Sequence, residues 1–240
     1  MPDSRTHRGP HPSDAQIFAP AQLPVLQRAT LDYSWLLSRG YAPKSSLELV
    51  GNRYQLPERG RLGVMRAACP DAAREARRAK RLEADAVRGQ ILHLDGYNVL
   101  MIVEAALGGG VLLRCRDEGL RDMASMHGNF RRVEETAPAI TMIGNFLASL
   151  SLEAVVWWLD APVSNSGRLA GLIRELAEQN AWNWRVEMVP DADFAMKKLE
   201  NAIVATADSV ILDVASAWFN LGAAIVARDI PSVWLVDLSA

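Results

Sequence analysis

The sequence lacks several features that would identify a protein class directly. Only two cysteines occur, Cys69 and Cys115, which is too few for a four-cysteine zinc site or a disulfide framework. No apolar run reaches the roughly 18 residues that a membrane-spanning helix needs, and the N-terminal residues lack the apolar segment of a secretory signal. Four histidines are too few for a histidine-rich metal site. We therefore expect a disulfide-free cytoplasmic protein that has no membrane partner.

The chain does have a core-forming composition and an uneven charge distribution. Half of its 240 residues are hydrophobic and 22% are charged, as in globular proteins. Residues 1–89 carry 15 Lys and Arg against 9 Asp and Glu, a balance of +6, whereas residues 90–240 carry 11 against 19, a balance of −8. This asymmetry predicts a polyanion-binding part joined to a cation-binding part, or else two ordinary solvated surfaces.

The basic part predicts a tail followed by helices. Residues 1–20 are rich in Pro, Ser, His and Asp and are expected to be disordered, and residues 21–89 show the apolar spacing of a helical N-terminal domain. Residues 61–89 predict helices broken near Pro70, with arginines crowded onto one helical face. That face could bind RNA phosphates or could simply be solvated. The arginines predicted to contact RNA are Arg77, Arg78 and Arg81.

From residue 90 onward, strand-like and helix-like segments alternate. This pattern predicts an α/β domain over residues 90–240, with a mainly parallel sheet covered by helices on both faces. The predicted strands are 90–95, 111–115, 154–159, 184–189, 202–206 and 232–236. The predicted helices are 117–127, 136–150, 166–180, 192–200 and 209–225.

Aspartates follow four of the predicted strands. They are Asp95, Asp160, Asp193 and Asp208. In a parallel sheet such strand ends meet at one edge, where ligands of open α/β folds bind. Any one of these residues could instead cap the next helix, because Asp is a favoured N-cap.

Four converging carboxylates would repel one another and raise one another's pKa values, and a divalent cation would remove that penalty. Because Mg²⁺ prefers oxygen ligands, the pattern predicts a cation site that serves phosphoryl chemistry.

The motifs resemble those of NYN and PIN-like ribonucleases. They are Asp95-Gly96-Tyr97-Asn98, Leu159-Asp160-Ala161, Ala192-Asp193 and Val204-Ala205-Thr206-Ala207-Asp208. They occur in the family's order. Residues 90–240 also resemble an uncharacterised bacterial and archaeal PIN-like family whose members carry a helical N-terminal extension like residues 20–85, so the resemblance covers most of the chain. The resemblance implies a three-layer α/β/α sandwich and Mg²⁺- or Mn²⁺-dependent hydrolysis of RNA. It also implies that the four aspartates are metal ligands or water-orienting acids, and that Asn98 orients Asp95 or the phosphate.

Two departures from the family pattern fall at Lys197 and Ala207, where an acid and a serine are expected. The cation site would then be weaker or would depend on further acids, for which Asp213, Asp191 or Asp122 are predicted. Other residues predicted to contact substrate are Arg121, His127, Ser164 and Asn165.

Three functions remain open from the sequence. The first is a metal-dependent ribonuclease, in which water attacks the phosphodiester in line and the carboxylates act as ligands. The second is a non-catalytic module that binds nucleic acid or protein, and the third is a metal-dependent phosphatase or nucleotide hydrolase. A homo-oligomer is compatible with each, because Trp182, Trp184 and Trp218 could line either an interface or the core.

Overall fold

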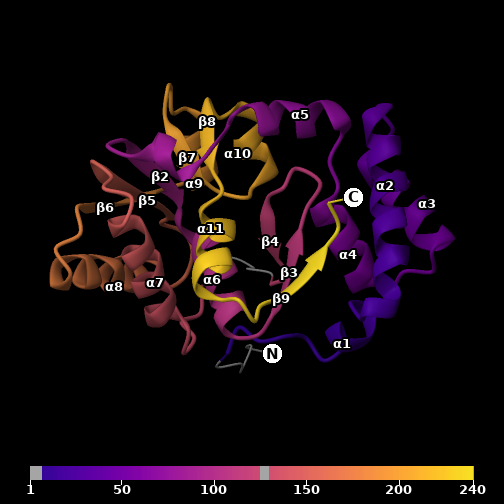
Figure 1. Cartoon of the computed structure of the whole chain (residues 1–240), viewed down its shortest axis with the longest axis horizontal. Coiled ribbons are helices and arrows are strands. Elements are labelled where there is room, and N and C mark those ends of the chain that lie inside the picture. Colours follow the sequence, from indigo (N-terminus) through magenta and orange to yellow (C-terminus); the bar gives the residue numbers. More distant parts are fainter. Residues whose placement is uncertain (1–6, 125–129, 240) are drawn as a thin grey trace.

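The chain forms an α/β structure whose elements are labelled in Figure 1. The structure is a computed structural model and describes residues 7–124 and 130–239. The α-helices within these ranges are α1 (Asp14–Ile17), α2 (Leu23–Ser38), α3 (Pro43–Arg53), α4 (Glu58–Ala67), α5 (Asp71–Ala79), α6 (Gly96–Leu107), α7 (Thr136–Ala148), α8 (Ser166–Gln179), α9 (Ala192–Lys197), α10 (Ser209–Val214) and α11 (Leu221–Asp229). The strands are β1 (Arg81–Leu82), β2 (Ile91–Asp95), β3 (Val111–Arg114), β4 (Leu120–Asp122), β5 (Ala154–Asp160), β6 (Trp184–Val189), β7 (Ile203–Ala205), β8 (Ala217–Phe219) and β9 (Trp234–Asp237). Short 3-10 helices occur at Pro20–Gln22 and Ala84–Val87.

The larger sheet is parallel throughout, with β2 near its centre. Its strand order is β1-β8-β7-β2-β5-β6. The register places Asp95 of β2 beside Trp158 of β5, and Leu94 of β2 beside Ala205 of β7. The predicted α/β fold with a mainly parallel sheet, preceded by a helical region, is therefore confirmed.

Helices cover both faces of this sheet and give a three-layer α/β/α sandwich. On one face, Leu92 and Leu94 are fully buried in an apolar core shared with α6, α7, α8 and α11. On the other face, α9 and α10 pack through a second apolar cluster that includes Trp218 and, at its margin, Trp158. Because side chains alternate along a strand, His93 and Asp95 lie on this second face.

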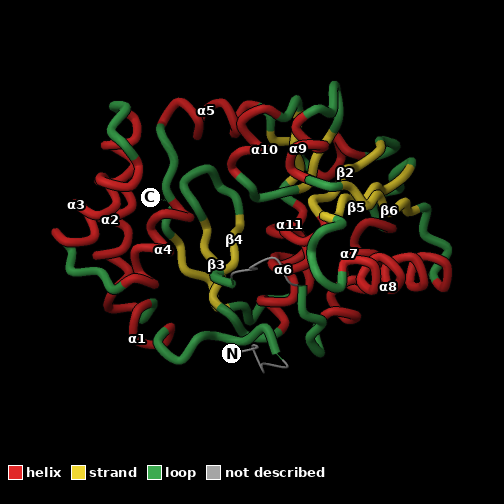
Figure 2. Tube along the Cα trace, turned by 180° about the vertical axis from the view of Figure 1, so that it is seen from behind, coloured by secondary structure: helices red, strands yellow, loops and turns green. Residues whose placement is uncertain are grey.

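The smaller sheet joins the N-terminal helices to the larger sheet (Figure 2). Its order is β4-β3-β9, with β3 antiparallel to β4 and parallel to β9. Val111 and Leu113 of β3 pack with Leu26 of α2, whereas Leu112 between them packs with Ile102 of α6. The N-terminal helices thus share their core with residues that follow in the α/β part.

Two predicted helices are wrong. Residues 117–127 were expected to be helical, but the described part of that segment forms a tight hairpin between β3 and β4. Asp117 shapes this turn by accepting a hydrogen bond from the Gly119 amide at 3.1 Å. The expected helix at 209–225 is split by β8, whose Trp218 is fully buried. An apolar segment of this kind suits a buried strand as well as a helix, and only pairing with β7 and β1 decides between them.

The expected disordered tail is ordered over residues 7–20. Asp14 is fully buried, and its Oδ2 accepts a hydrogen bond from Arg59 Nη2 at 2.8 Å. Arg8 donates through Nε to Glu104 Oε2 at 2.9 Å. A polar composition was a poor guide here, because charged partners elsewhere in the fold hold the segment in place. Among the described residues, no helix is both long and apolar enough to cross a membrane.

Candidate active site

Four aspartates gather at the carboxyl edge of the larger sheet. Asp95 ends β2, Asp160 ends β5 and Asp208 directly precedes α10 after β7. Asp193 lies in the first turn of α9, which follows the edge strand β6. Because β7, β2, β5 and β6 are consecutive in the sheet, the four residues lie along one continuous edge.

Asp95 is the most buried member of this group, with 8% of its surface exposed. Its Oδ2 accepts a hydrogen bond from Thr206 Oγ1 at 2.7 Å, and its Oδ1 accepts one from the Asn98 amide at 3.3 Å. Burial raises the pKa of the Asp95 carboxyl to about 7, and the nearby charges of Asp193 and Asp208 raise it further, against the lowering effect of these hydrogen bonds. Asp95 is therefore both a helix cap and a carboxyl group that titrates near neutral pH.

Asp160 and Asp208 each commit one oxygen to a helix N-terminus. Asp160 Oδ1 accepts from the Ala192 amide at 2.7 Å, and Asp208 Oδ1 accepts from the Val210 amide at 2.7 Å. Within the described part of the chain, neither Oδ2 atom accepts a hydrogen bond. Capping and ligand binding are thus compatible at both positions, because one oxygen orients the carboxylate and the other stays available.

Asp193 is the exposed member of the group on α9. Partial desolvation raises the pKa of its carboxyl, and the charges of Asp208, Asp160 and Asp191 raise it further, whereas Lys197 lowers it. The mutual influence of these groups shows that the carboxylates are electrostatically coupled.

The site offers the hard oxygen donors that Mg²⁺ or Mn²⁺ prefers. Among the described residues, however, no three His, Cys, Asp or Glu side chains converge closely enough to hold a metal ion as they stand. Mg²⁺ needs only one or two carboxylates and keeps waters in its other positions. The four aspartates fit a hydrated cation bound by a few carboxylate oxygens better than an all-protein cage.

Three neighbouring residues hold these acids in place. Thr206 Oγ1, besides donating to Asp95, accepts from the Asp208 amide at 2.9 Å and so links two of the acids. Asn98 Oδ1 accepts from the Ala207 amide at 2.7 Å, which fastens α6 to the turn before Asp208. At Gly96, a Cβ atom would lie 2.8 Å from the Trp158 carbonyl oxygen, so a side chain there would displace β5 from β2. Sequence reasoning missed Thr206, although it lies two positions before Asp208.

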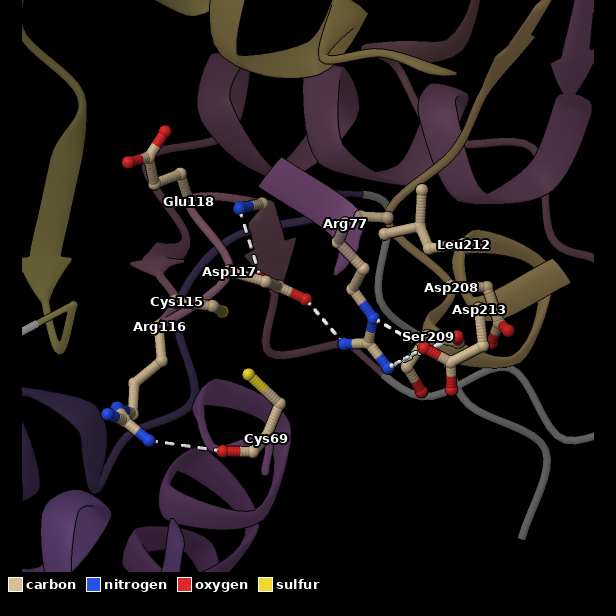
Figure 3. Close-up of polar contacts among 12 residues, drawn as sticks. Cys69, Arg77, Cys115, Arg116, Asp117, Glu118, Asp208, Ser209, Leu212 and Asp213 are labelled. Atoms are coloured by element: carbon tan, nitrogen blue, oxygen red, sulfur yellow. Dashed lines mark hydrogen bonds and ion pairs between the residues drawn. The ribbon is translucent and has the colours of Figure 1, made fainter. Parts of the chain in front are cut away.

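Arg77 does not face solvent, so its predicted contact with RNA is wrong. Only 3% of its surface is exposed. Its Nη1 donates to Asp117 Oδ2 and its Nε to Asp213 Oδ1, both at 2.7 Å (Figure 3). The helical pattern identified the face of α5 on which Arg77 lies, but not the helix α10 that packs against α5.

Arg121 belongs to the same buried cluster and was wrongly expected to bind substrate from a helix. It lies on β4, and its Nη1 and Nη2 donate to the two carboxylate oxygens of Asp117 at 2.8 and 2.7 Å. Its Nε donates to the Ala207 carbonyl at 2.8 Å. Burial would raise the pKa of Asp117, but Arg121 and Arg77 outweigh burial and lower it to about 2. The cluster therefore clamps the turn that precedes Asp208.

Of the three additional acids predicted for the cation site, Asp191 caps α9 beside Asp193, whereas Asp213 and Asp122 lie elsewhere. Asp213 is ion-paired with Arg77 at the far end of α10. Asp122 is buried on β4 of the smaller sheet, where Arg66 approaches it at 3.7 Å. Burial raises the pKa of Asp122. Neither position could be known before the hairpin and α10 were placed.

The other predicted substrate contacts have mixed outcomes. Arg81 lies on β1, not on a helix, and pairs with Glu118 and with Glu83. Arg78 is exposed on α5. His127 lies outside the described residues.

Ser164 and Asn165 lie in the loop between Asp160 and α8. Asn165 adopts a left-handed conformation with φ of 68° and donates through Nδ2 to the Phe130 carbonyl at 3.0 Å. The Ser164 carbonyl accepts from the Phe130 amide at 3.1 Å. The loop is thereby tied to the segment that leads into α7.

Comparison with known proteins gives a family but no activity. Residues 84–224 match a domain of unknown function, DUF5616, and residues 25–80 match a protein of unknown function, DUF434. An uncharacterized protein of Methanocaldococcus jannaschii is 32% identical over 187 residues, which are 78% of this chain and 88% of that protein. No solved structure matches significantly. The chain therefore belongs to the DUF5616 family, with a DUF434 segment preceding the α/β part.

Proposed function

We propose that the protein is a divalent-cation-dependent ribonuclease that hydrolyses RNA phosphodiester bonds at the carboxyl edge of the larger sheet. The observation that carries this proposal is the coupled group of four aspartates, in which Asp95 has a pKa of about 7. Such a group is costly when empty and favourable around a cation. The similarity of the motifs to NYN and PIN-like ribonucleases supports RNA as the substrate.

The proposal assigns roles to the residues around this edge. Asp95, Asp160, Asp193 and Asp208 would hold Mg²⁺ or Mn²⁺. When bound, the cation would lower the pKa of a water and offset charge on the phosphate. Thr206 and Asn98 keep the acids oriented through their hydrogen bonds, so that little rearrangement is needed on binding.

A binding module that does not cleave RNA is the second candidate. Two observations favour it. No three described acids converge on one point, and Lys197 places a positive charge near Asp193. In this alternative, Lys197 would contact a phosphate directly.

Cleavage of labelled single-stranded and structured RNA, measured with Mn²⁺, Mg²⁺ or EDTA, tests the proposal. Asp193→Asn is the sharpest variant, because Asp193 is exposed and caps no helix. Its cleavage rate should fall by about 10- to 100-fold or more, because the cation would lose one of its proposed ligands, and loss of even an outer-shell partner of a metal ligand costs about this much. Asp85→Asn is the matched control, since the Asp85 side chain is 93% exposed and lies outside the site.

Cleavage that persists in EDTA, or that is unchanged in Asp193→Asn, would overturn the proposal. RNA binding without cleavage under either cation would instead support the binding module.

A further inference from the structure

A pocket lined by arginines lies beside the loop that follows Asp160. It forms where the first turns of α7 and α8 meet the segment around Phe130, and it has a volume of about 270 Å³. Three arginines contribute to its lining, and three apolar side chains form its wall. We call it the arginine pocket: Arg131, Arg132, Arg168, Phe130, Leu169 and Leu172.

The charge in this pocket is not balanced. Within the described part of the chain, none of the side chains of Arg131, Arg132 and Arg168 forms an ion pair. Elsewhere, many arginines pair with acids, as Arg59 does with Asp14 and Arg116 with Asp71. Arg132 and Arg168 are exposed, so solvent weakens the repulsion between them, but three guanidinium groups around one hollow give it a positive potential that an anion would lower.

Arg168 adds a second unfavourable feature. It lies in the first turn of α8, a helix of 14 residues whose first turn contains no acidic residue. The N-terminus of a helix carries partial positive charge, so a cation there opposes the helix dipole. Thr136, the first residue of α7, also lines the pocket. The N-terminus of α8 therefore adds to the positive potential, whereas Glu135 at the N-cap of α7 offsets that of α7.

We propose that the arginine pocket binds a nucleotide of single-stranded RNA, with the arginines on its phosphate and the apolar wall against its base. The pairing of cationic and apolar surfaces matches the way single strands are held, by backbone charge and by contact with base faces. Guanidinium groups suit phosphate because their N–H donors can bind two oxygens at once. The inference rests on the proposed function, since it gives the substrate a second point of attachment.

The pocket lies within reach of the carboxylates. Asn165 is five positions after Asp160, so their Cα atoms are at most about 18 Å apart. Two turn hydrogen bonds shorten this span, from the Val163 amide to the Asp160 carbonyl and from the Ser166 amide to the Val163 carbonyl. A strand lying across the carboxylates can therefore enter the pocket a few nucleotides away.

RNA affinity in EDTA tests the inference separately from cleavage. The probe is a fluorescent single-stranded RNA of about 12 nucleotides, within the usual range of single-strand sites, and anisotropy is followed against salt. The double variant Arg132→Gln/Arg168→Gln should raise the Kd about tenfold. It should also lower the salt slope by about 1.4, for two lost phosphate contacts. Arg185→Gln, an exposed arginine on β6, is the matched control and should change neither.

The thermal stability of the double variant provides a further readout. Its Tm should be equal to or above that of the wild type, because the change removes a cation from a helix N-terminus. A weaker RNA complex with an undiminished Tm therefore assigns the loss to the pocket and not to misfolding.

Three results would overturn the inference. The first is an unchanged Kd and salt slope for RNA in the double variant, and the second is no RNA binding by the wild type. The third is a double variant that loses affinity for an acidic peptide but keeps its affinity for RNA. A wild type that cleaves RNA with neither Mn²⁺ nor Mg²⁺ could still bind RNA through the arginine pocket. That result would reject the proposed nuclease function and support the arginine pocket as an RNA-binding site.

Discussion

Replacing Asp95 by asparagine should stabilise the protein at alkaline pH while removing its proposed activity. The pKa of Asp95 is about 7 in the folded protein, against 3.8 for an ordinary aspartate. Between these values the folded protein binds a proton that the unfolded chain has lost. The free energy of unfolding therefore falls as the pH rises from about 4 to about 7, and it levels off above that.

The size of the effect follows from the same two values. A difference of about three pH units corresponds to about 4 kcal/mol of stability lost by pH 8. The asparagine side chain in Asp95→Asn cannot ionise and would avoid this loss. The substitution would also disturb the hydrogen bonds with Thr206 and Asn98, at a cost of about 1 kcal/mol. The expected net gain is about 3 kcal/mol at pH 8, or roughly 6–12 °C in Tm for a chain of this size.

Thermal unfolding in EDTA at pH 4.5 and pH 8 measures this gain. The variant should exceed the wild type at pH 8 and lose that advantage at pH 4.5, where Asp95 is protonated. Adding Mn²⁺ at pH 8 should raise the Tm of the wild type more than that of Asp95→Asn, because a ligand stabilises only the state that binds it. Asp85→Asn should match the wild type at both pH values. A variant no more stable than the wild type at pH 8, with the same pH dependence, would refute the reasoning about Asp95.

Two further substitutions test the support of the site. Asp117→Asn removes the charge between two buried guanidinium groups and should lower the free energy of unfolding by about 3–5 kcal/mol in urea titrations; a loss below about 1 kcal/mol would contradict the role of this cluster. Gly96→Ala places a Cβ atom 2.6 Å from Leu159 Cδ2 and should cost about 1–3 kcal/mol. Gly167→Ala, whose Cβ meets nothing within 4 Å, is its control and should be neutral or stabilising.

The fold class and the edge of the sheet could be predicted because they depend on local patterns. Buried parallel strands are apolar runs, and the residue after each run is at the carboxyl edge wherever the strand lies in the sheet. That reasoning placed Asp95, Asp160 and Asp208 on one edge without knowledge of the strand order. It left capping and cation binding as alternatives, and the structure shows that a carboxylate can cap a helix with one oxygen and keep the other available.

The surroundings of these acids could not be predicted, because they depend on contacts between distant segments. Arg77 and Arg121 were expected at the surface, yet both are buried against Asp117, which lies 40 positions after the first and four before the second. Asp213 lies about one helical turn beyond Asp208, as expected, but its side chain pairs with Arg77 instead of joining the other acids. Helical periodicity says which residues share a face and nothing about what covers that face.

The sequence by itself determined the alternation of strands and helices and the residues that follow each strand, since these depend on apolar spacing over a few positions. Only the tertiary structure decided which acids are coupled and which arginines pair with acids. Coupling depends on the strand order that brings β7, β2 and β5 together. Likewise, whether an arginine pairs internally or is left to bind a ligand depends on which distant carboxylate the fold brings within reach of it.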